Sequence, residues 1–212
     1  MQGPRDRSVK SAPPRSFLEM RVKITIISCS LLTVIFTACG GAAATPTGPS
    51  AAGEPGARSA FFALTSPVGV DGGTMPAGYT CDGAGSSLPL SWSNAPAGTR
   101  EFALLMTTLP GDGTTKWNWV LYNIPGTLSS LQENSRATGT AGLGSDGPIV
   151  GYQPPCSQGP GLKLYTITLY ALSASPRLSV PASQVTGSVL ASAISSITLG
   201  SASLTLGYTR PR

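Results

Sequence analysis

The stretch KWNWVLYNIP, residues 116–125, carries bulky apolar side chains on alternate positions of both parities. Its aromatic and β-branched residues and its closing proline favour a strand over a helix. Regular alternation divides the stretch into two faces: Trp117, Trp119, Leu121 and Asn123 on one, and Asn118, Val120, Tyr122 and Ile124 on the other. We therefore expect a strand buried on both faces, or on one face with a ligand cleft on the other. Pro125 ends the strand because it cannot donate a ladder hydrogen bond.

Asn118 is the polar exception deep in this strand, and a tryptophan flanks it on either side. A buried amide must find hydrogen-bond partners. Two interpretations remain open for Asn118. It is either a satisfied asparagine of the core or strand end, or a residue of a ligand cleft.

Shorter apolar runs predict the rest of the fold, with strands at 59–65, 88–92, 101–108, 164–172 and 203–208. Pro89 lies inside the second run, which makes it an edge strand. Apolar residues at helical spacing predict one short helix over 188–197. Residues 126–163 lack a long periodic segment and are expected to form a long functional loop region. The pattern as a whole predicts an all-β fold, an antiparallel β-sandwich with one short helix in the C-terminal region.

The first 58 residues have a different character. Met20 is the expected start, which makes residues 1–19 an over-extended beginning. A basic stretch at 20–23, an apolar stretch at 24–37 and small residues before Cys39 resemble a bacterial lipoprotein signal over 1–38. Cys39 would then carry the lipid, and residues 39–58, rich in Gly, Ala and Pro, would form a flexible linker to a domain at 59–212. The alternative is a single membrane anchor that stays attached.

In either interpretation the domain lies in the bacterial cell envelope, facing the periplasm or the exterior, which is an oxidising compartment. Cys81 and Cys156 are the two cysteines of that domain, and we expect them to form a disulfide. Two free thiols or a metal pair are the alternatives. The metal pair lacks further Cys or His ligands.

The amino-acid composition limits the kinds of catalysis and ligand binding that the protein can perform. The chain has no histidine, which removes imidazole acid–base catalysis and imidazole metal ligation. Six of the 14 basic residues and two of the nine acidic residues precede Cys39. The remaining eight basic and seven acidic residues leave the domain near neutral. We expect no nucleic-acid partner, no metal and no cofactor. The absence of a nucleophile–base pair or paired carboxylates also argues against an enzyme.

Several stretches resemble the phosphatidylethanolamine-binding protein family, in its bacterial Raf-kinase-inhibitor-like branch. They run in family order: YTCDG at 79–83, LPLSW at 88–92, PAGT at 96–99, WVLYNIP at 119–125, GY at 151–152, PC at 155–156, Tyr165 with LYAL at 169–172, and LGY at 206–208 with Arg210. The resemblance implies a β-sandwich with a small surface pocket for an anionic head group such as phosphate.

The expected pocket departs from the family pattern. The family has a histidine where Asn118 stands and a His-Arg-Tyr sequence where Lys163, Leu164 and Tyr165 stand. It also has an Asp-Pro-Asp-x-Pro segment where this chain reads TTLPG at 107–111, without either Asp. By the resemblance, the candidate ligand-binding residues are Asn118, Trp119, Tyr152, Lys163, Tyr165 and Asp82, and Trp117 is a further candidate wall. The ordinary alternative is that these aromatic residues belong to the core and Lys163 to the solvated surface.

The sequence thus predicts a non-enzymatic, lipid-anchored binding module for a small polar or weakly anionic ligand. The alternative is an interaction or inhibitor protein that acts on an envelope enzyme through the loops at 126–163. A structural role with a vestigial pocket also remains open.

Overall fold

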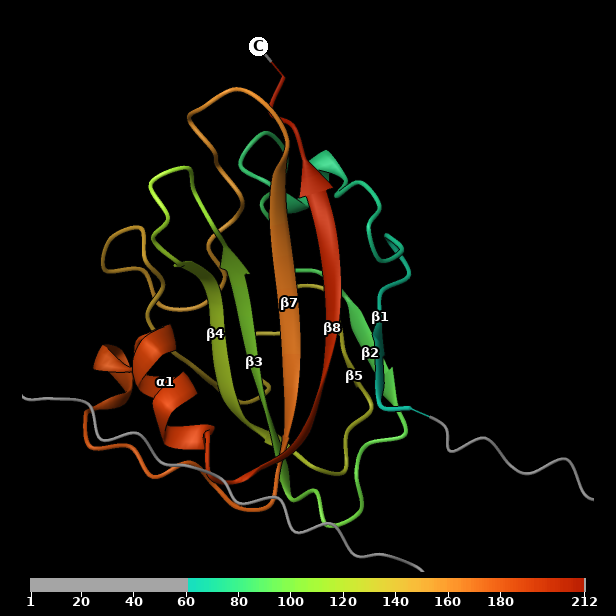
Figure 1. Ribbon diagram of the computed structural model, residues 1–212, viewed down its shortest axis with the longest axis vertical. Coiled ribbons are helices and arrows are strands. Elements are labelled where there is room, and N and C mark those ends of the chain that lie inside the picture. Colours follow the sequence, from blue (N-terminus) through green and yellow to red (C-terminus); the bar gives the residue numbers. More distant parts are fainter. Residues whose placement is uncertain (1–60, 212) are drawn as a thin grey trace, which may run out of the picture. The chain divides into compact units, whose positions relative to one another are not determined.

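The computed structural model describes residues 61–211. The expected signal, Cys39 and the linker lie outside the described residues. Two antiparallel sheets pack face to face (Figure 1). The smaller sheet has the order β1-β2-β5, with bounds Ala63–Thr65, Leu90–Ser93 and Ser130–Leu131. The larger has the order β6-β4-β3-β7-β8, with bounds Thr140–Ala141, Lys116–Pro125, Glu101–Thr108, Lys163–Leu172 and Thr198–Tyr208. The predicted β-sandwich is therefore confirmed.

Three short helical segments complete the fold: η1 (Ala77–Tyr79), η2 (Ala182–Gln184) and α1 (Gly187–Ile194). Helix α1 is the short helix predicted near the C-terminus, and the Thr186 hydroxyl caps it by accepting a hydrogen bond from the Val189 N–H. Among residues 61–211, no helix is both long and apolar enough to cross a membrane.

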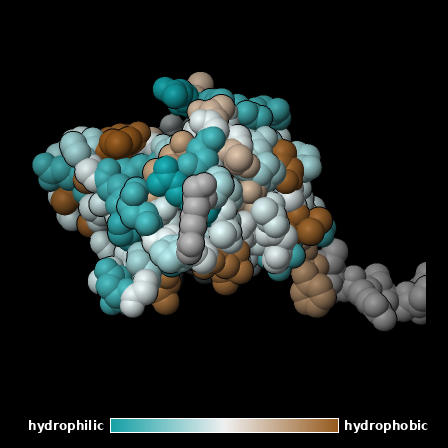
Figure 2. Space-filling view, turned by 90° about the horizontal axis from the view of Figure 1, so that it is seen from above, coloured by the Kyte–Doolittle hydropathy of each residue, from teal (hydrophilic) through white to brown (hydrophobic). Residues whose placement is uncertain are grey.

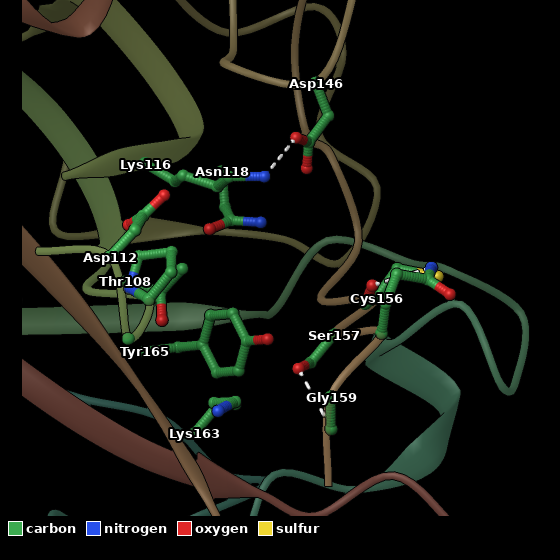
Figure 3. A pocket seen from close by; sticks show the side chains of 13 residues that line it. Thr108, Asp112, Lys116, Asn118, Asp146, Cys156, Ser157, Gly159, Lys163 and Tyr165 are labelled. Atoms are coloured by element: carbon green, nitrogen blue, oxygen red, sulfur yellow. Dashed lines mark hydrogen bonds and ion pairs between the residues drawn. The ribbon is translucent and has the colours of Figure 1, made fainter. Parts of the chain in front are cut away.

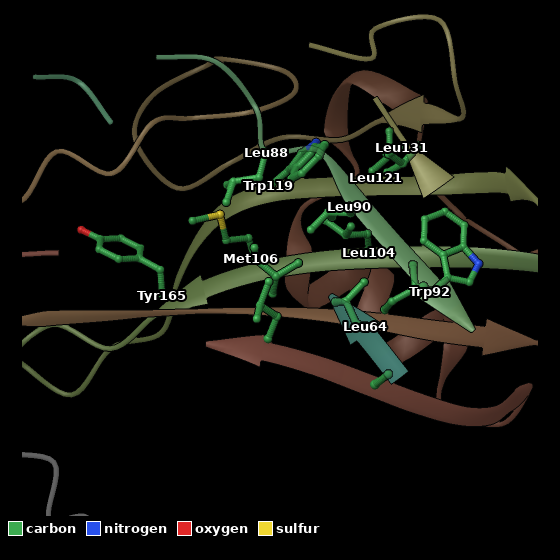
Figure 4. Close-up of a cluster of buried hydrophobic side chains, with 14 of the residues drawn as sticks. Leu64, Leu88, Leu90, Trp92, Leu104, Met106, Trp119, Leu121, Leu131 and Tyr165 are labelled. Atoms are coloured by element: carbon green, nitrogen blue, oxygen red, sulfur yellow. The ribbon is translucent and has the colours of Figure 1, made fainter. Parts of the chain in front are cut away.

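The large sheet is buried on both faces by two separate cores. One core fills the space between the sheets, and its side chains include Leu64, Leu90, Trp92, Leu104, Met106, Trp119, Leu121 and Leu131 (Figure 4). The second lies under α1 and contains Ala103, Leu105, Val120, Tyr122, Leu172, Val185, Leu190 and Ile194. Strands β3 and β4 thus contribute alternate residues to opposite cores, which explains why their sequences are bulky at every position.

Strand β2 corrects one prediction. We expected an edge strand at 88–92 because of Pro89, but β2 is the middle strand of the small sheet, between β1 and β5. Pro89 precedes the first paired residue, Leu90, so its missing N–H leaves no gap in the ladder. The proline marks where the strand begins and says nothing about which strands lie beside it.

Strand β4 has the predicted bounds, but two β-bulges break its alternation. Opposite β3, Met106 pairs with Trp119 and Thr107 pairs with Trp117, so Asn118 is an extra residue on β4. A second register shift lies near Asn123, which has a positive φ of 54°.

The bulges change which side chains share a face. Trp119, Leu121 and Ile124 all reach the core between the sheets, whereas Trp117 packs against the core under α1. The prediction that Trp117 and Trp119 share a face is wrong because the alternation rule assumes an unbroken ladder.

The long loop region at 126–163 holds short ordered pieces: β5, β6 and two bridges that join Leu143 to Val150 and to Thr186. A disulfide joins Cys81 to Cys156, the pair expected from the sequence. The Cys81 N–H also donates to the Pro155 carbonyl at 3.0 Å. These contacts tie the end of the loop region to the segment that follows η1.

Candidate functional site

A cavity of about 330 Å³ opens at the end of the large sheet where β3 ends and β4 and β7 begin (Figure 3). The strands place its floor, because Thr108 on β3 pairs with both Lys116 on β4 and Tyr165 on β7. Loops supply the walls. The lining residues are Thr108, Pro110, Gly111, Asp112, Lys116, Asn118, Asp146, Cys156, Ser157, Gln158, Gly159, Lys163 and Tyr165.

Asn118 is placed in this cavity by the bulge in β4. Its side chain is buried, with the residue 5% exposed. The amide Nδ2 donates to the Gln153 carbonyl at 3.2 Å, and the Gln153 N–H donates back to the Asn118 carbonyl at 2.6 Å. The other amide atom, Oδ1, is buried and has no hydrogen-bond partner among the described residues. Such an unpaired buried acceptor is uncommon in folded proteins.

The buried Gln153 side chain fixes the loop that forms one wall. Its Oε1 accepts from the Asp146 N–H at 3.0 Å, and its Nε2 donates to the carbonyls of Asp146 and Ile149. A Cβ at Gly144 would lie 2.3 Å from the Gln153 amide, so a larger residue at 144 would displace this amide from its hydrogen bonds. This loop holds the Asp146 carboxylate at the rim, where it accepts from Lys116 Nζ at 2.8 Å.

The charges around the cavity are mixed. Asp112 and Asp146 lie on it together with Lys116 and Lys163. Hydrogen bonds from the Thr114 backbone and hydroxyl hold the pKa of the Asp112 carboxyl below its ordinary value. The hydrogen bond to Asp146 raises the pKa of the Lys116 amine. The segment at 107–111 lacks the two aspartates of the family pattern, but loops bring Asp112 and Asp146 to the cavity.

Tyr165 and Lys163 come from the start of β7. Tyr165 is 2% exposed, and in Figure 3 its hydroxyl points into the cavity. Burial raises the pKa of this hydroxyl, which keeps it neutral. Lys163 is half-buried, pairs in register with Tyr208 on β8, and forms no salt bridge within residues 61–211. Asn118, Lys163 and Tyr165, three of the six predicted ligand residues, therefore meet in one cavity.

Asp82 lies in a different place. Its carboxylate accepts from Arg210 Nε and from the Tyr208 hydroxyl, both at 2.9 Å. Although desolvation acts to raise it, the hydrogen bonds from Arg210 and Tyr208 keep the pKa of the Asp82 carboxyl below its ordinary value. Asp82 lines a neighbouring cavity that shares only the wall at 157–159 with the first.

Trp119 and Tyr152 also lie outside the cavity of Asn118. Their rings meet edge to face with centroids 5.3 Å apart, and the Tyr152 hydroxyl donates to the Tyr79 carbonyl at 2.6 Å. Both line a separate cavity of about 360 Å³ that includes Arg136. Trp117 lies on the face toward α1. The predicted set therefore divides among three cavities: Asn118 and Trp119 are adjacent on β4 and face different sides, and Tyr152 and Asp82 lie in loops.

The sequence reasoning missed Asp112, Lys116 and Asp146 at the cavity. A signal for Lys116 was available, since it has the same parity as Asn118 at the start of the strand. The sequence held no such signal for Asp112 and Asp146, because both lie in irregular loops. Residues 61–211 hold no group of three or more His, Cys, Asp or Glu side chains placed to bind a metal ion.

A family model described as phosphatidylethanolamine-binding protein matches residues 65–209. The chain belongs to the phosphatidylethanolamine-binding protein family. A UPF0098 protein of Methanothermobacter thermautotrophicus is 36% identical over 107 residues, which cover 48% of this chain and 70% of that protein. A protein of Mycobacterium tuberculosis named as a lipoprotein, LppC, is 31% identical over 159 residues, which cover 74% of each.

Solved structures of the phosphatidylethanolamine-binding protein family share the fold. The homologue CT736 of Chlamydia trachomatis has a TM-score of 0.64 at 26% identity, over 71% of this chain and 98% of that one. YbcL of Escherichia coli has a TM-score of 0.64 at 23% identity, over 72% of this chain and 100% of that one. The second likeness concerns the fold alone.

Proposed function

We propose that this member of the phosphatidylethanolamine-binding protein family is a non-enzymatic binding protein of the cell envelope that holds a small polar ligand at the end of β3, β4 and β7. One observation carries the proposal: Asn118, Lys163 and Tyr165 converge on one cavity of about 330 Å³. Its size suits a small molecule, and most of its lining side chains are polar or charged.

The surroundings favour a polar ligand over an apolar one. The end of the sandwich seen from above in Figure 2 is mostly hydrophilic or neutral, with hydrophobic residues in separate patches. Two carboxylates and two amines balance at the cavity, so nothing there selects a strongly charged anion. A neutral, zwitterionic or weakly anionic ligand fits this balance.

Attachment to the membrane through Cys39 is the second part of the proposal. It rests on the lipoprotein-like signal before Cys39 and on the similarity to LppC, which is named as a lipoprotein. A linker of about 20 residues spans up to roughly 65 Å when extended, which leaves the domain free to meet ligands near the membrane surface.

Native mass spectrometry of the full-length chain, purified from the envelope in nonionic detergent, tests the binding function. We expect a bound small molecule in the wild type and its loss, by about tenfold in occupancy or more, in Lys163→Ala. Arg177→Ala is the matched control, since Arg177 is an exposed cation at another cavity. An unliganded wild type that also gives no heat with phosphoethanolamine would refute the function.

A second candidate is contact with an envelope enzyme through the loops at 126–163. Large apolar side chains exposed there support it: Ile149 is 53%, Val150 48% and Leu162 63% exposed. A photo-crosslinking residue at position 149 should give a discrete adduct in cells, and one at position 199, where Leu199 is 43% exposed on β8, should not. Equal labelling at both positions would contradict specific contact.

A further inference from the structure

A second cavity, of about 360 Å³, lies beside the core between the sheets and shares no lining residue with the cavity of Asn118. From its walls and its charge we infer that it is a separate binding site, for small carboxylic acids that carry an aromatic or branched apolar group. The carboxylate lies at Arg136 and the apolar group packs against Trp119. The inference concerns a different cavity from the proposed function, so either can fail without the other.

Strands β4 and β6 supply an apolar wall. Trp119 and Leu121 lie two residues apart on β4, and both belong to the core between the sheets (Figure 4). Ala141 on β6 pairs in register with Leu121, so the two side chains lie side by side. The Tyr152 ring meets the Trp119 ring edge to face, and its hydroxyl is held by the Tyr79 carbonyl at 2.6 Å. The wall therefore presents fixed aromatic surface, against which a ring or a branched alkyl group packs well.

The loop at 149–151 adds a second apolar wall. Ile149 is 53% exposed and Val150 is 48% exposed, and both line the cavity. The Gly151 N–H donates to the Gly142 carbonyl at 2.9 Å, which holds this loop beside the end of β6. An apolar group that enters the cavity covers side-chain surface that otherwise contacts water, and this burial favours binding.

Arg136 gives the cavity a positive charge. It is the only charged residue among those that line the cavity: Gly85, Ser87, Trp119, Leu121, Asn134, Ser135, Arg136, Ala141, Ile149, Val150, Gly151 and Tyr152. The two salt bridges within residues 61–211 join other side chains, so Arg136 has no acidic partner there. A guanidinium binds a carboxylate through two parallel hydrogen bonds. The cavity therefore selects an acid over a neutral molecule of the same shape, unlike the first cavity with its balanced charges.

Hydrogen bonds fix the segment that carries Arg136. Asn134 has a positive φ of 55°, a conformation that a residue other than glycine keeps only where its surroundings hold it. Its Oδ1 accepts from the Ser87 N–H at 3.1 Å, and its Nδ2 donates to the Ser86 hydroxyl at 3.0 Å. Both serines are buried. Because the backbone beside Arg136 is already ordered, binding loses less conformational entropy there.

Calorimetric titration of the full-length chain with 3-phenylpropionate, after subtraction of a detergent blank, tests the inference. The comparison ligands are 3-phenylpropionamide, which keeps the ring without the charge, and propionate, which keeps the charge without the ring. We expect a dissociation constant of about 1 mM or lower for 3-phenylpropionate. Each comparison ligand should bind at least about fivefold more weakly, a modest effect for the charge because Arg136 is an exposed residue.

Variants assign the binding to this cavity. Arg136→Gln should bring the affinities of the acid and the amide to within about twofold of each other. Arg177→Gln is the matched control, because Arg177 is an exposed cation at another cavity. Ala141→Leu fills the cavity and keeps Arg136, so it should weaken binding of the acid by about tenfold or more. Lys163→Met, at the first cavity, should leave binding of the acid unchanged.

Five results would overturn the inference. A dissociation constant above about 1 mM would show that the walls do not hold the ring. Equal binding of acid and amide by the wild type, or a preference for the acid that persists in Arg136→Gln, would remove Arg136 from the site. Unchanged binding in Ala141→Leu would place the ligand outside the cavity, and loss of binding in Lys163→Met would move it to the first cavity. The proposed function has a separate test, the species bound in native mass spectrometry.

Discussion

Gly187→Ala tests the bulge that places Asn118 in the cavity. Gly187 begins α1, and a Cβ on it would lie 2.1 Å from Trp117 Cδ2, 2.3 Å from Cε3 and 2.5 Å from Cγ. Trp117 lies there only because the extra residue, Asn118, turns it away from the face of Trp119. If β4 alternated regularly, Trp117 would point toward the small sheet and Gly187 would have room for a methyl group.

The magnitude follows from two opposed effects. Replacing glycine by alanine in a helix normally stabilises it by about 0.5–1 kcal/mol. Carbon atoms pack at about 3.5–4.0 Å, so the indole must move by more than about 1 Å, and overpacking of this kind costs about 1–3 kcal/mol. The difference between the two effects is a fall in the free energy of unfolding of about 0–2.5 kcal/mol, with the middle of the range near 1 kcal/mol.

Urea denaturation followed by circular dichroism measures this change. Gly78→Ala is the matched control, because Gly78 is not at positive φ and a Cβ there meets nothing within 4 Å, so its effect should stay within about 0.5 kcal/mol. In a Trp117→Leu background the Gly187→Ala change should become neutral or stabilising. Stabilisation by Gly187→Ala in the wild-type background would refute the packing of Trp117 under α1, and with it the bulge.

Three further predictions concern the disulfide, the cavity and the anchor. Replacing both Cys81 and Cys156 by Ser should lower the free energy of unfolding by about 4 kcal/mol, because the bond closes a loop with a separation of 75 residues; labelling of both thiols in the denatured, unreduced chain would contradict it. Sulfate binding measured by calorimetry should stay nearly constant between about pH 5.5 and 8, because the chain has no histidine. The pKa of the Asp112 carboxyl is lowered and the pKa values of Lys116 and Tyr165 are raised, so all three move away from this pH range. A steep dependence of sulfate binding on pH would mean that another group binds the anion. Mass spectrometry of the mature N-terminus should find a lipid-modified Cys39, and an unmodified peptide running through Cys39 would refute the anchor.

Local pattern was enough to locate the principal strands. The bounds of β3 and β4 match the predicted segments, and β7 begins one residue before its predicted start. The signals there are short-range: bulky residues on both parities, β-branched side chains, and Pro125 as a stop. The same kind of signal gave α1, whose buried Leu190 and Ile194 lie four residues apart on one helical face.

Three of the predicted site residues line one cavity, and all three lie near the start of a strand. Asn118, Lys163 and Tyr165 lie at the starts of β4 and β7, and pairing of both strands with β3 brings them together. Other cavities are lined by the remaining predicted residues, Trp119, Tyr152 and Asp82. Loops supply two carboxylates that line the first cavity, Asp112 and Asp146. Loop paths depend on distant contacts such as those of the Gln153 side chain, which no local pattern encodes.

The sequence by itself determined the fold class, the positions of β3, β4, β7 and α1 and the absence of imidazole chemistry, because hydrophobic period and composition are properties of neighbouring residues. It did not predict β5 or β6, and it placed the start of β8 at 203 instead of Thr198. The tertiary structure alone decided that β2 is a middle strand, that Trp117 and Trp119 face opposite cores, and that Asn118 Oδ1 is left without a partner. Each of these features depends on the register between strands or on a loop that packs against a strand, such as the loop of Gln153 beside Asn118. Those contacts join residues far apart in the chain, and their geometry is settled only when the two sheets and the helix pack together.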